Sequence, residues 1–217
     1  YLKYSYNFTW LGRPIIQYPQ DIVHFQELVF KVRPEIIVET GIAHGGSLIL
    51  SASLLSLLDL MDGIDKNESK RKVIGIDIDI RKHNYQAIKE HPLRDKIVMI
   101  EGSSIDKDIF KKVKELAKDS SSTIVSLDSN HTHKHVFEEL NLYTSLVTKN
   151  SYCIVYDTVI EELPSICCED RPWGVGNNPL SAVKEWLEDN NDFKVDKFYD
   201  KKALISVAKS GFLKRVK

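Results

Sequence analysis

The sequence lacks the features that mark several large classes of protein. No apolar run comes near the roughly 20 residues that a membrane helix requires, and the longest such run, residues 48–61, contains serines and an aspartate. The 30 basic and 31 acidic residues leave a net charge of -1, so there is no broad electrostatic attraction to nucleic acid or to a membrane surface. No internal repeat or low-complexity segment is evident. We therefore expect a globular protein with neither a membrane span nor a nucleic-acid partner.

Cysteine is also scarce, at three residues: Cys153, Cys167 and Cys168. The count is odd, the spacing is unlike that of a zinc finger, and adjacent cysteines bridge only with strain. Structural thiols in a reducing compartment are the simpler interpretation, which predicts a cytoplasmic location. The sequence begins at Tyr1 rather than at a methionine, so it leaves open whether a targeting segment precedes it.

Short β-branched runs alternate with amphipathic segments along the chain. This alternation predicts an α/β fold, a doubly wound and mostly parallel Rossmann-like sheet between two helical layers. Residues 1–18 are expected to form an irregular arm, and residues 19–217 the domain. The expected strands span residues 36–39, 73–79, 97–100, 123–128, 152–157, 193–196 and 203–207. The expected helices span residues 21–32, 46–60, 83–90, 106–118, 133–146 and 179–188.

The segment over residues 36–47 carries the clearest signal. A buried strand ends in Glu39, glycines follow at Gly41, Gly45 and Gly46, and a helix starts near Ser47. Glycines let the backbone approach a ligand closely, and the free N–H groups of the helix face the turn, which is typical of a nucleotide-type cofactor site. The spacing lacks the G-x-G-x-x-G of dinucleotide sites and resembles the first motif of S-adenosylmethionine (SAM) dependent methyltransferases. The alternative is an ordinary tight turn of another α/β protein.

Two further strand ends supply candidates for the same cofactor. Asp77 follows Gly41 by 36 positions and ends the next strand, where a carboxylate accepts hydrogen bonds from both hydroxyls of a ribose. Asp79 is the alternative for that role. Ser103 and Ser104, at the end of the third strand, are expected beside the adenine edge.

The fourth and fifth strands end in Asp128 and Asp157. Two carboxylates that converge on one pocket repel each other unless a cation or proton lies between them, and oxygen ligands of this kind suit Mg²⁺. His131, three residues after Asp128, is then placed to remove a proton from a substrate hydroxyl. A zinc site made of His131, His133 and His135 is disfavoured because alternate residues of a helix do not share a face. Capping or surface packing is expected for His133 and His135.

Several of these motifs together resemble one family, that of cephalosporin hydroxylase and rhamnosyl O-methyltransferase. The matching segments are residues 39–41 with 45–47, 75–81 with 83–84, 127–133, and 171–174 with 176–179, within a likeness that spans about residues 10–215. The resemblance implies a SAM-dependent, Mg²⁺-dependent O-methyltransferase that is often oligomeric, here a homo-oligomer. Its acceptor would be a sugar hydroxyl of a glycan, a glycolipid or a glycosylated metabolite. Related macrolide sugar O-methyltransferases use an acid at the position of Asp128 and a base at that of His131.

The sequence departs from that family at one position of the metal site. Where the relatives have a Glu-Asp pair at the fifth strand, this chain has Tyr156 and Asp157, which weakens the expectation of metal binding. Thr158, a water molecule, Glu161 or Glu162 could replace the missing carboxylate. The missing acid also motivates the alternative of a non-catalytic SAM-binding subunit. A nicotinamide-dependent oxidoreductase is a third hypothesis, which the glycine spacing disfavours.

The long segment over residues 159–178 has two prolines, two glycines and little periodicity. Loops of that length inside a compact domain are usually functional. The segment is predicted to form a lid over a sugar ring. Trp173 would stack on the ring, and Arg171 and Asn177 would form hydrogen bonds with the substrate. The alternative is a packed Ω-loop without contact to a ligand.

Overall fold

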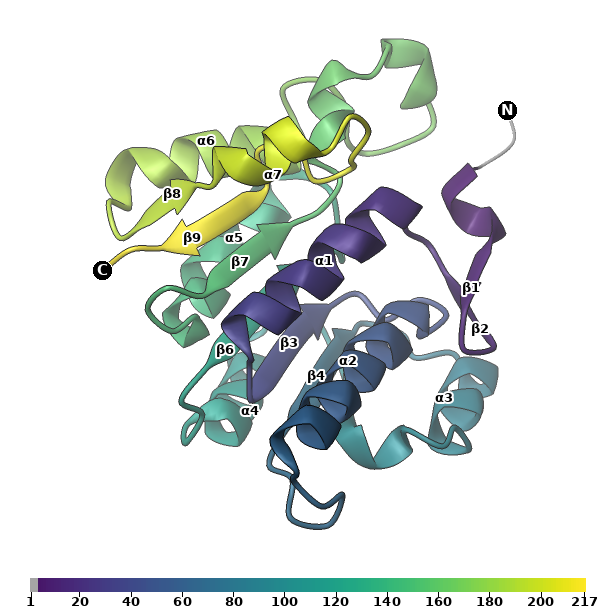
Figure 1. Cartoon of the computed structure of the whole chain (residues 1–217). Helices are drawn as coiled ribbons and strands as arrows, with labels where there is room; N and C mark the ends of the chain where they lie inside the picture. Colours follow the sequence, from purple (N-terminus) through teal and green to yellow (C-terminus); the bar gives the residue numbers. More distant parts are fainter. Residues whose placement is uncertain (1–3) are drawn as a thin grey trace.

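A seven-stranded sheet forms the centre of the protein, with helices on both of its faces (Figure 1). The structure is a computed structural model that describes residues 4–217, so the first three residues of the predicted arm lie outside the described residues. The strand order is β5-β4-β3-β6-β7-β9-β8, in which β9 runs antiparallel to both of its neighbours. The strands of this sheet are β3 (Ile36–Thr40), β4 (Lys72–Asp77), β5 (Ile97–Glu101), β6 (Thr123–Leu127), β7 (Tyr152–Val155), β8 (Phe193–Val195) and β9 (Phe212–Arg215).

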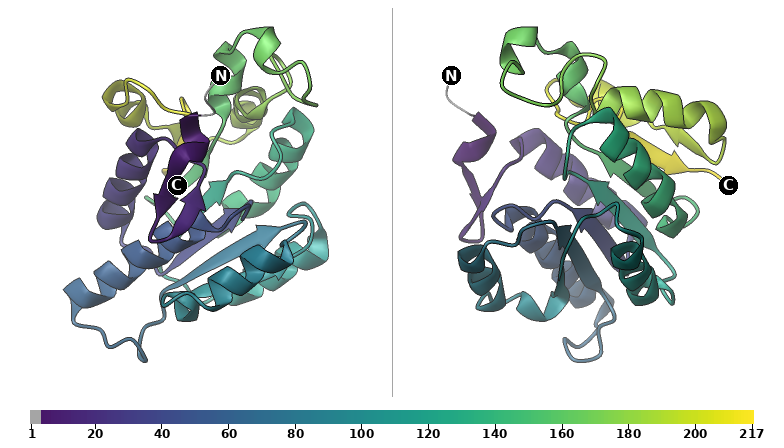
Figure 2. Two further views of the ribbon diagram at one scale, coloured as in Figure 1. Left: turned by 90° about the vertical axis from the view of Figure 1, so that its right-hand side faces the viewer. Right: turned by 180° about the vertical axis from the view of Figure 1, so that it is seen from behind.

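Two hydrophobic cores lie between the sheet and its helical layers. One contains buried side chains of α1, α2 and α7, and the other contains those of α4, α5 and α6. Figure 2 shows the two layers from the side and from behind. The doubly wound, mostly parallel sheet predicted from the sequence is therefore confirmed. The helices are α1 (Pro19–Val32), α2 (Gly46–Asp62), α3 (Lys82–Lys89), α4 (Lys107–Ala117), α5 (His133–Tyr143), α6 (Pro179–Asp189) and α7 (Lys197–Lys202).

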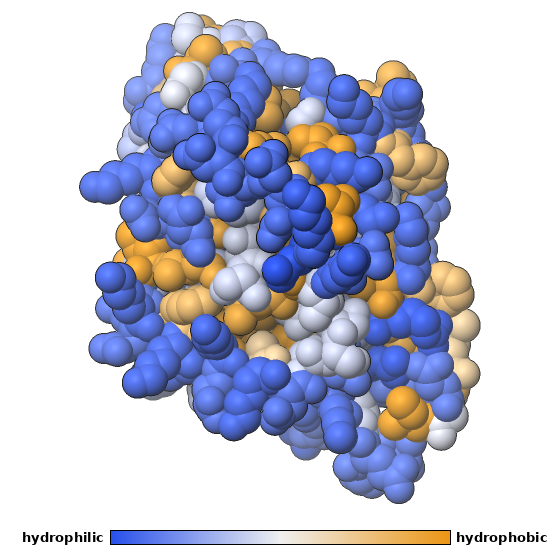
Figure 3. All heavy atoms as spheres, turned by 90° about the vertical axis from the view of Figure 1, so that its left-hand side faces the viewer, coloured by the Kyte–Doolittle hydropathy of each residue, from blue (hydrophilic) through white to orange (hydrophobic). Residues whose placement is uncertain are grey.

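The surface of the protein is expected to be mostly hydrophilic, because apolar side chains are buried in these two cores. On the face shown in Figure 3, hydrophilic residues predominate, and apolar residues show in separate patches between them. No helix within residues 4–217 is both long enough and apolar enough to cross a membrane.

Parallel pairing of the central strands brings the predicted site residues to one edge of the sheet. Thr40 at the end of β3 pairs with Leu127 of β6, and Leu127 pairs with Val155 of β7. The residues that follow, beginning with Gly41 and Asp128, therefore leave the sheet side by side. Ligands of open α/β sheets bind at this carboxyl edge.

Two of the predicted elements are wrong. The expected strand over residues 203–207 is a loop in which Leu204 is 97% exposed, because the Asp21 carboxylate binds the Ser206 hydroxyl and the Val207 N–H and holds this segment against α1. The last strand lies further on, at β9. The arm is not irregular either, since β1 (Phe8–Trp10) and β2 (Arg13–Ile15) form an antiparallel hairpin after a 3-10 turn (Tyr4–Asn7).

The division of the chain into an arm and a domain stays a prediction. The hairpin contacts α2, and the Trp10 indole donates a hydrogen bond to the Ser53 hydroxyl of that helix.

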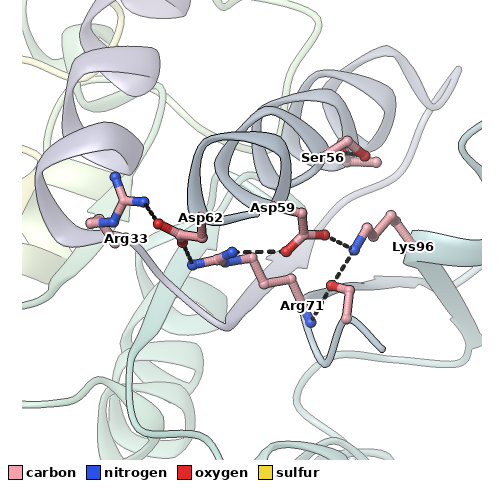
Figure 4. A network of polar contacts seen from close by, with 8 residues as sticks. Arg33, Ser56, Asp59, Asp62, Arg71 and Lys96 are labelled. Carbon is pink, nitrogen blue, oxygen red and sulfur yellow. Dashed lines mark hydrogen bonds and ion pairs between the residues drawn. The ribbon is translucent and has the colours of Figure 1, made fainter. Parts of the chain in front are cut away.

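An ion-pair network joins four segments at the opposite edge of the sheet, where the parallel strands begin (Figure 4). Arg71, which precedes β4, binds Asp59 of α2 at 2.8 Å and Asp62 at 2.6 Å. Lys96, which precedes β5, also pairs with Asp59, and Arg33 after α1 pairs with Asp62. Burial alone would raise the pKa of Asp59, but the hydrogen bonds from Lys96, Ser69 and Arg71 outweigh it and lower that pKa. The carboxylate thus stays charged between two cations.

Replacing Asp59 by alanine should destabilise the fold strongly. Arg71 and Lys96 would be left as buried cations without this partner, which typically costs about 3–5 kcal/mol. Urea unfolding of the Asp59→Ala variant measures the loss. The matched control is Glu115→Ala, which breaks an exposed ion pair with Lys118 and should change the free energy of unfolding by less than about 1 kcal/mol. Similar values for the two variants would mean that the network adds nothing to stability.

Candidate functional site

The loop after β3 passes very close to the end of β6. Gly41 has φ +91°, and a Cβ atom on it would lie 2.1 Å from the backbone oxygen of Asp128. The Asp128 N–H donates to the Thr40 carbonyl at 3.0 Å and fixes the same approach. A side chain at position 41 would therefore be strained in its backbone and would also collide with the neighbouring loop.

The helix that follows begins without a side-chain cap. Its N-cap is Gly45, with φ +83°, and no side chain there accepts a hydrogen bond from the first turn of α2. The first N–H groups of a helix have no intrahelical partner and favour an anionic or polar ligand. Gly46 and Ser47, the first two residues of α2, line a cavity of about 500 Å³.

Asp77 holds this loop from the neighbouring strand. Its Oδ2 atom accepts hydrogen bonds from the N–H groups of Ile42 at 2.8 Å and Ala43 at 3.1 Å, and its Oδ1 atom accepts one from Asp79. It also lines a second cavity of about 160 Å³. A ribose contact by Asp77 stays a prediction, and the structure adds a loop-positioning role that the spacing did not indicate.

The 160 Å³ cavity brings together half of the predicted cofactor residues. Gly41, Asp77, Ser103 and Ser104 line it, together with Ser129, Asn130 and His135. The His135 Nε2 atom lies 3.0 Å from the Ser104 hydroxyl and 3.2 Å from that of Ser129. His135, which the sequence assigned to capping or surface packing, therefore belongs to the wall of this cavity.

The second centre of the site is an acidic cluster. Asp128, His131 and Asp157 each offer one ligand atom, and these atoms lie within 4.8 Å of one another. The His131 Nε2 atom lies 3.2 Å from the Asp157 Oδ2 atom. Asp157 has φ +55°, a left-handed conformation that costs an aspartate less than most residues. The structure thus brings together the three residues predicted for metal binding and catalysis.

The electrostatics of this cluster suit a cation. Burial, and then the neighbouring carboxylates Asp157 and Glu39, raise the pKa of Asp128 well above its usual range. A divalent ion beside Asp128 and Asp157 would offset both effects, because it favours the charged forms of the acids. The two carboxylates are oxygen donors of the kind that bind Mg²⁺, and the His131 imidazole lies beside them.

The substitutes considered for the missing acid are engaged elsewhere. Thr158 donates to the Val207 carbonyl, Glu161 accepts from the Gly176 N–H and from Asn178, and Glu162 pairs with Lys209 at 2.5 Å. Tyr156 itself is 6% exposed and belongs to the core on the α1 side. Thr158, Glu161 and Glu162 therefore do not supply a metal ligand in this conformation.

The segment over residues 158–178 lies on the same side of the molecule as the hairpin (Figure 1). It contains 3-10 turns at Thr158–Glu162 and Ser165–Cys167. Trp173 packs edge-on against His131 with ring centroids 4.7 Å apart, and the Arg171 guanidinium lies 5.5 Å from the Trp173 ring. Both residues line the 500 Å³ cavity, as the predicted lid requires.

Asn177, the third residue predicted for the substrate, lies differently. Its side-chain oxygen accepts from the His133 N–H at 3.0 Å, and its Nδ2 atom donates to the Pro172 carbonyl at 2.9 Å. The amide therefore ties the segment to the start of α5, and Asn177 is absent from the residues that line the cavity. A direct substrate contact by Asn177 stays a prediction, and in this structure both ends of its amide are bound within the protein.

Glu39 and Ser47 also face inward. The Ser47 hydroxyl donates to the Glu39 carboxylate, which is buried beneath the glycine loop. Burial raises the pKa of Glu39 to about 7, and the hydrogen bond from Ser47 opposes that rise. A direct cofactor contact by Glu39 stays a prediction, whereas its support of the loop through Ser47 is visible here.

The hairpin supplies site residues that the sequence did not indicate. The Arg13 guanidinium donates to the His44 carbonyl at 2.6 Å and to the Asn84 side chain at 2.8 Å, and Asn84 donates to the Ala43 carbonyl. Gln17 donates to the Asp128 carboxylate at 3.1 Å. No spacing rule connects these positions, because they come from distant segments that meet only in the folded chain.

Comparison with known proteins gives a consistent result. The model of a family described as Rhamnosyl O-methyltransferase/CmcI matches residues 2–216. A rhamnosyl O-methyltransferase of Mycobacterium tuberculosis (strain ATCC 25618 / H37Rv) is 25% identical over 210 residues, which are 95% of this chain and 78% of that protein. The protein of the same name from Mycobacterium leprae (strain TN) is 25% identical over 209 residues, 95% of this chain and 82% of that protein.

Solved structures share the fold. A structure of CmcI described with Mg and SAM is 21% identical, with a TM-score of 0.64, and the match covers 98% of this chain and 78% of that one. An O-methyltransferase from Bacillus cereus in complex with SAH is 15% identical, with a TM-score of 0.59 over 92% of this chain and 82% of that one.

The stability of the protein should depend on the protonation of Glu39. Because the folded state raises its pKa from 4.5 to about 7, the stabilisation from its proton is complete below about pH 4.5 and is lost as the pH rises through about 7. We expect Glu39→Gln to be more stable than the original protein at about pH 8, by up to ~3 kcal/mol, and nearly equal to it at about pH 4.5. Urea unfolding at both pH values measures this, with Glu138→Gln at an exposed position as the control. A difference that does not change with pH would contradict the prediction.

Proposed function

The chain belongs to the Rhamnosyl O-methyltransferase/CmcI family, and from this membership and the site geometry we infer that it is a SAM-dependent O-methyltransferase acting on a sugar hydroxyl. The observation that carries the proposal is the adjacency of the glycine loop to the acidic cluster, with Gly41 against the backbone of Asp128. A methyl donor and an acceptor bound on the two sides of this contact would lie next to each other. The curated relatives are named for a rhamnosyl group, so rhamnosides are the first acceptors to test.

The methyl donor is assigned to the loop and the cavity beside it. Gly41 and the uncapped start of α2 at Gly45, Gly46 and Ser47 offer backbone to the donor, and Asp77 offers a carboxylate on the wall of the 160 Å³ cavity. Ser103 and Ser104 lie on the same wall and are assigned to the purine end of the donor. SAM, when bound, would supply a sulfonium-bound methyl group, and its in-line transfer to the acceptor oxygen would break the bond between sulfur and methyl and release S-adenosylhomocysteine.

The acceptor is assigned to the larger cavity, beneath Trp173. An indole ring next to His131 gives a sugar an apolar face to pack on, and Arg171 offers donors to its hydroxyls. Orientation of the acceptor against the methyl group then supplies much of the rate. The geometry thus favours the lid hypothesis over a packed loop without ligand contact.

His131 is proposed as the base. Since its Nε2 atom faces the Asp157 carboxylate at 3.2 Å, the Nε2–H tautomer is favoured and Nδ1 is left to accept the hydroxyl proton. The Asp157 carboxylate then stabilises the imidazolium that forms. Positioned bases of this kind contribute about 10²–10⁴-fold in rate.

Asp128 and Asp157 are the residues that would hold Mg²⁺. The ion, when bound, lowers the pKa of an acceptor hydroxyl that lies against it. The raised pKa of Asp128 and the shared geometry of the cluster support this assignment. The substitution at Tyr156 leaves fewer carboxylates than the family pattern has, so weaker metal binding than in the relatives is expected.

We also propose that the enzyme acts as a homo-oligomer in the cytoplasm. The described cysteines are free thiols, which favours a reducing compartment. Exposed apolar side chains on the adjoining helices α1 and α2, among them Phe30, Leu60 and Met61, are candidates for a contact between subunits.

Removal of divalent cations should suppress methyl transfer. Protein dialysed against EDTA is supplied with SAM and a rhamnoside, and transfer is measured from a labelled methyl group. We expect little product until Mg²⁺ is restored. Full activity in EDTA would remove the cation from the mechanism, and SAM binding without transfer to any glycoside in either buffer would favour a non-catalytic subunit.

Replacement of His131 by alanine should lower kcat by about 10²–10⁴-fold, because the acceptor proton loses its base. Binding of S-adenosylhomocysteine, measured by calorimetry, should not change. The control is His83→Ala, at an exposed position of α3, which should keep normal turnover. A near-normal kcat for His131→Ala would give this residue a structural role instead.

A further inference from the structure

Gln17 links the hairpin to the acidic cluster. It lies between β2 and α1 and is 6% exposed, and its Nε2 atom donates to the Oδ2 atom of Asp128 at 3.1 Å. The bond joins residues 111 positions apart in the chain. Its Oε1 atom is buried and has no hydrogen-bond partner among the described residues. An unpaired buried amide oxygen reduces stability, and the hydrogen bond that this amide does make is to the Asp128 carboxylate.

The backbone that carries Gln17 is held firmly in place. A Cβ atom on Gly46 would lie 2.2 Å from the Pro14 oxygen, so this part of the arm lies directly on the start of α2. Ile15 is buried in the core, and Arg13 is bound to the His44 carbonyl. Three independent contacts of the same short segment therefore hold Gln17 in a position from which its side chain reaches Asp128.

Asp128 needs such a contact to keep its orientation. Gln17 is the side-chain donor that the structure provides to this carboxylate, whereas the neighbouring side chains Glu39 and Asp157 are acceptors that repel it. Side chains that bind a metal-ligating group through its other atom fix the orientation of that group. An amide donor suits this purpose because it occupies one oxygen and adds no charge.

We propose that Gln17 is a positioning residue of the metal site: its amide holds the Asp128 carboxylate so that the second oxygen is presented to the cation. This inference rests on the proposed function, since it takes Asp128 to be a metal ligand.

The test is the affinity of the full chain for Mn²⁺, measured by electron paramagnetic resonance without substrate. Gln17→Met keeps the volume of the side chain and removes the amide, and should weaken Mn²⁺ binding by about 10–100-fold, as is typical when the partner of a metal ligand is lost. Affinity for S-adenosylhomocysteine should remain unchanged. Turnover of the variant should recover as the Mg²⁺ concentration is raised. Gln20→Met, at an exposed position of α1, is the matched control.

The outcomes separate this inference from the proposed function. Unchanged Mn²⁺ affinity in Gln17→Met overturns the positioning role and leaves the methyltransferase assignment intact. Loss of both Mn²⁺ and S-adenosylhomocysteine binding also overturns it, because the residue would then serve the fold. Failure of the original protein to bind Mn²⁺ removes the metal from the proposed function, and the inference with it.

Discussion

The contact between Gly41 and the backbone of Asp128 is the constraint on which the site depends. β3 and β6 are adjacent parallel strands, so their following loops leave the same edge of the sheet, but loops with ordinary side chains would keep several ångströms between them. The absence of a side chain at Gly41 removes that separation. The glycine loop and the acidic cluster thus form one site rather than two neighbouring ones. The positions of Asp77, His131 and Trp173 follow from this shared edge of the sheet.

The site is also a concentration of buried negative charge. Asp128, Glu39 and Asp21 all have raised pKa values, for which burial is the largest cause in each case. Burying acids without matching cations opposes folding. At the opposite edge of the sheet, Asp59 and Asp62 are paired with Arg71 and Lys96, so that edge carries its charges in compensated form. The molecule therefore has one edge with balanced charges and one edge with uncompensated acids, where a cation is stabilising.

Much of this arrangement could be predicted from the sequence because it depends on local patterns. β-branched runs that end in an acid or a glycine locate the central strands, and parallel pairing then places Asp128 beside Asp157. The errors have a different origin. The largely apolar run at residues 203–207 resembles a strand, but binding of Ser206 and Val207 to Asp21 holds it as a loop. The roles of Arg13, Gln17 and Asn177 depend on partners 31 or more positions away, apart from the contact between Asn177 and Pro172. No local pattern encodes such pairings.

The hydrogen bond between Gln17 and Asp128 has a consequence for the order of assembly. A growing polypeptide contains Gln17 long before Asp128 exists, and the hairpin cannot settle until β3, α2 and β6 have formed beneath it. Contacts of such large sequence separation form slowly and late in folding. A partly folded molecule in which the arm has not docked therefore lacks the contact between Gln17 and Asp128 even when its central sheet is already in place.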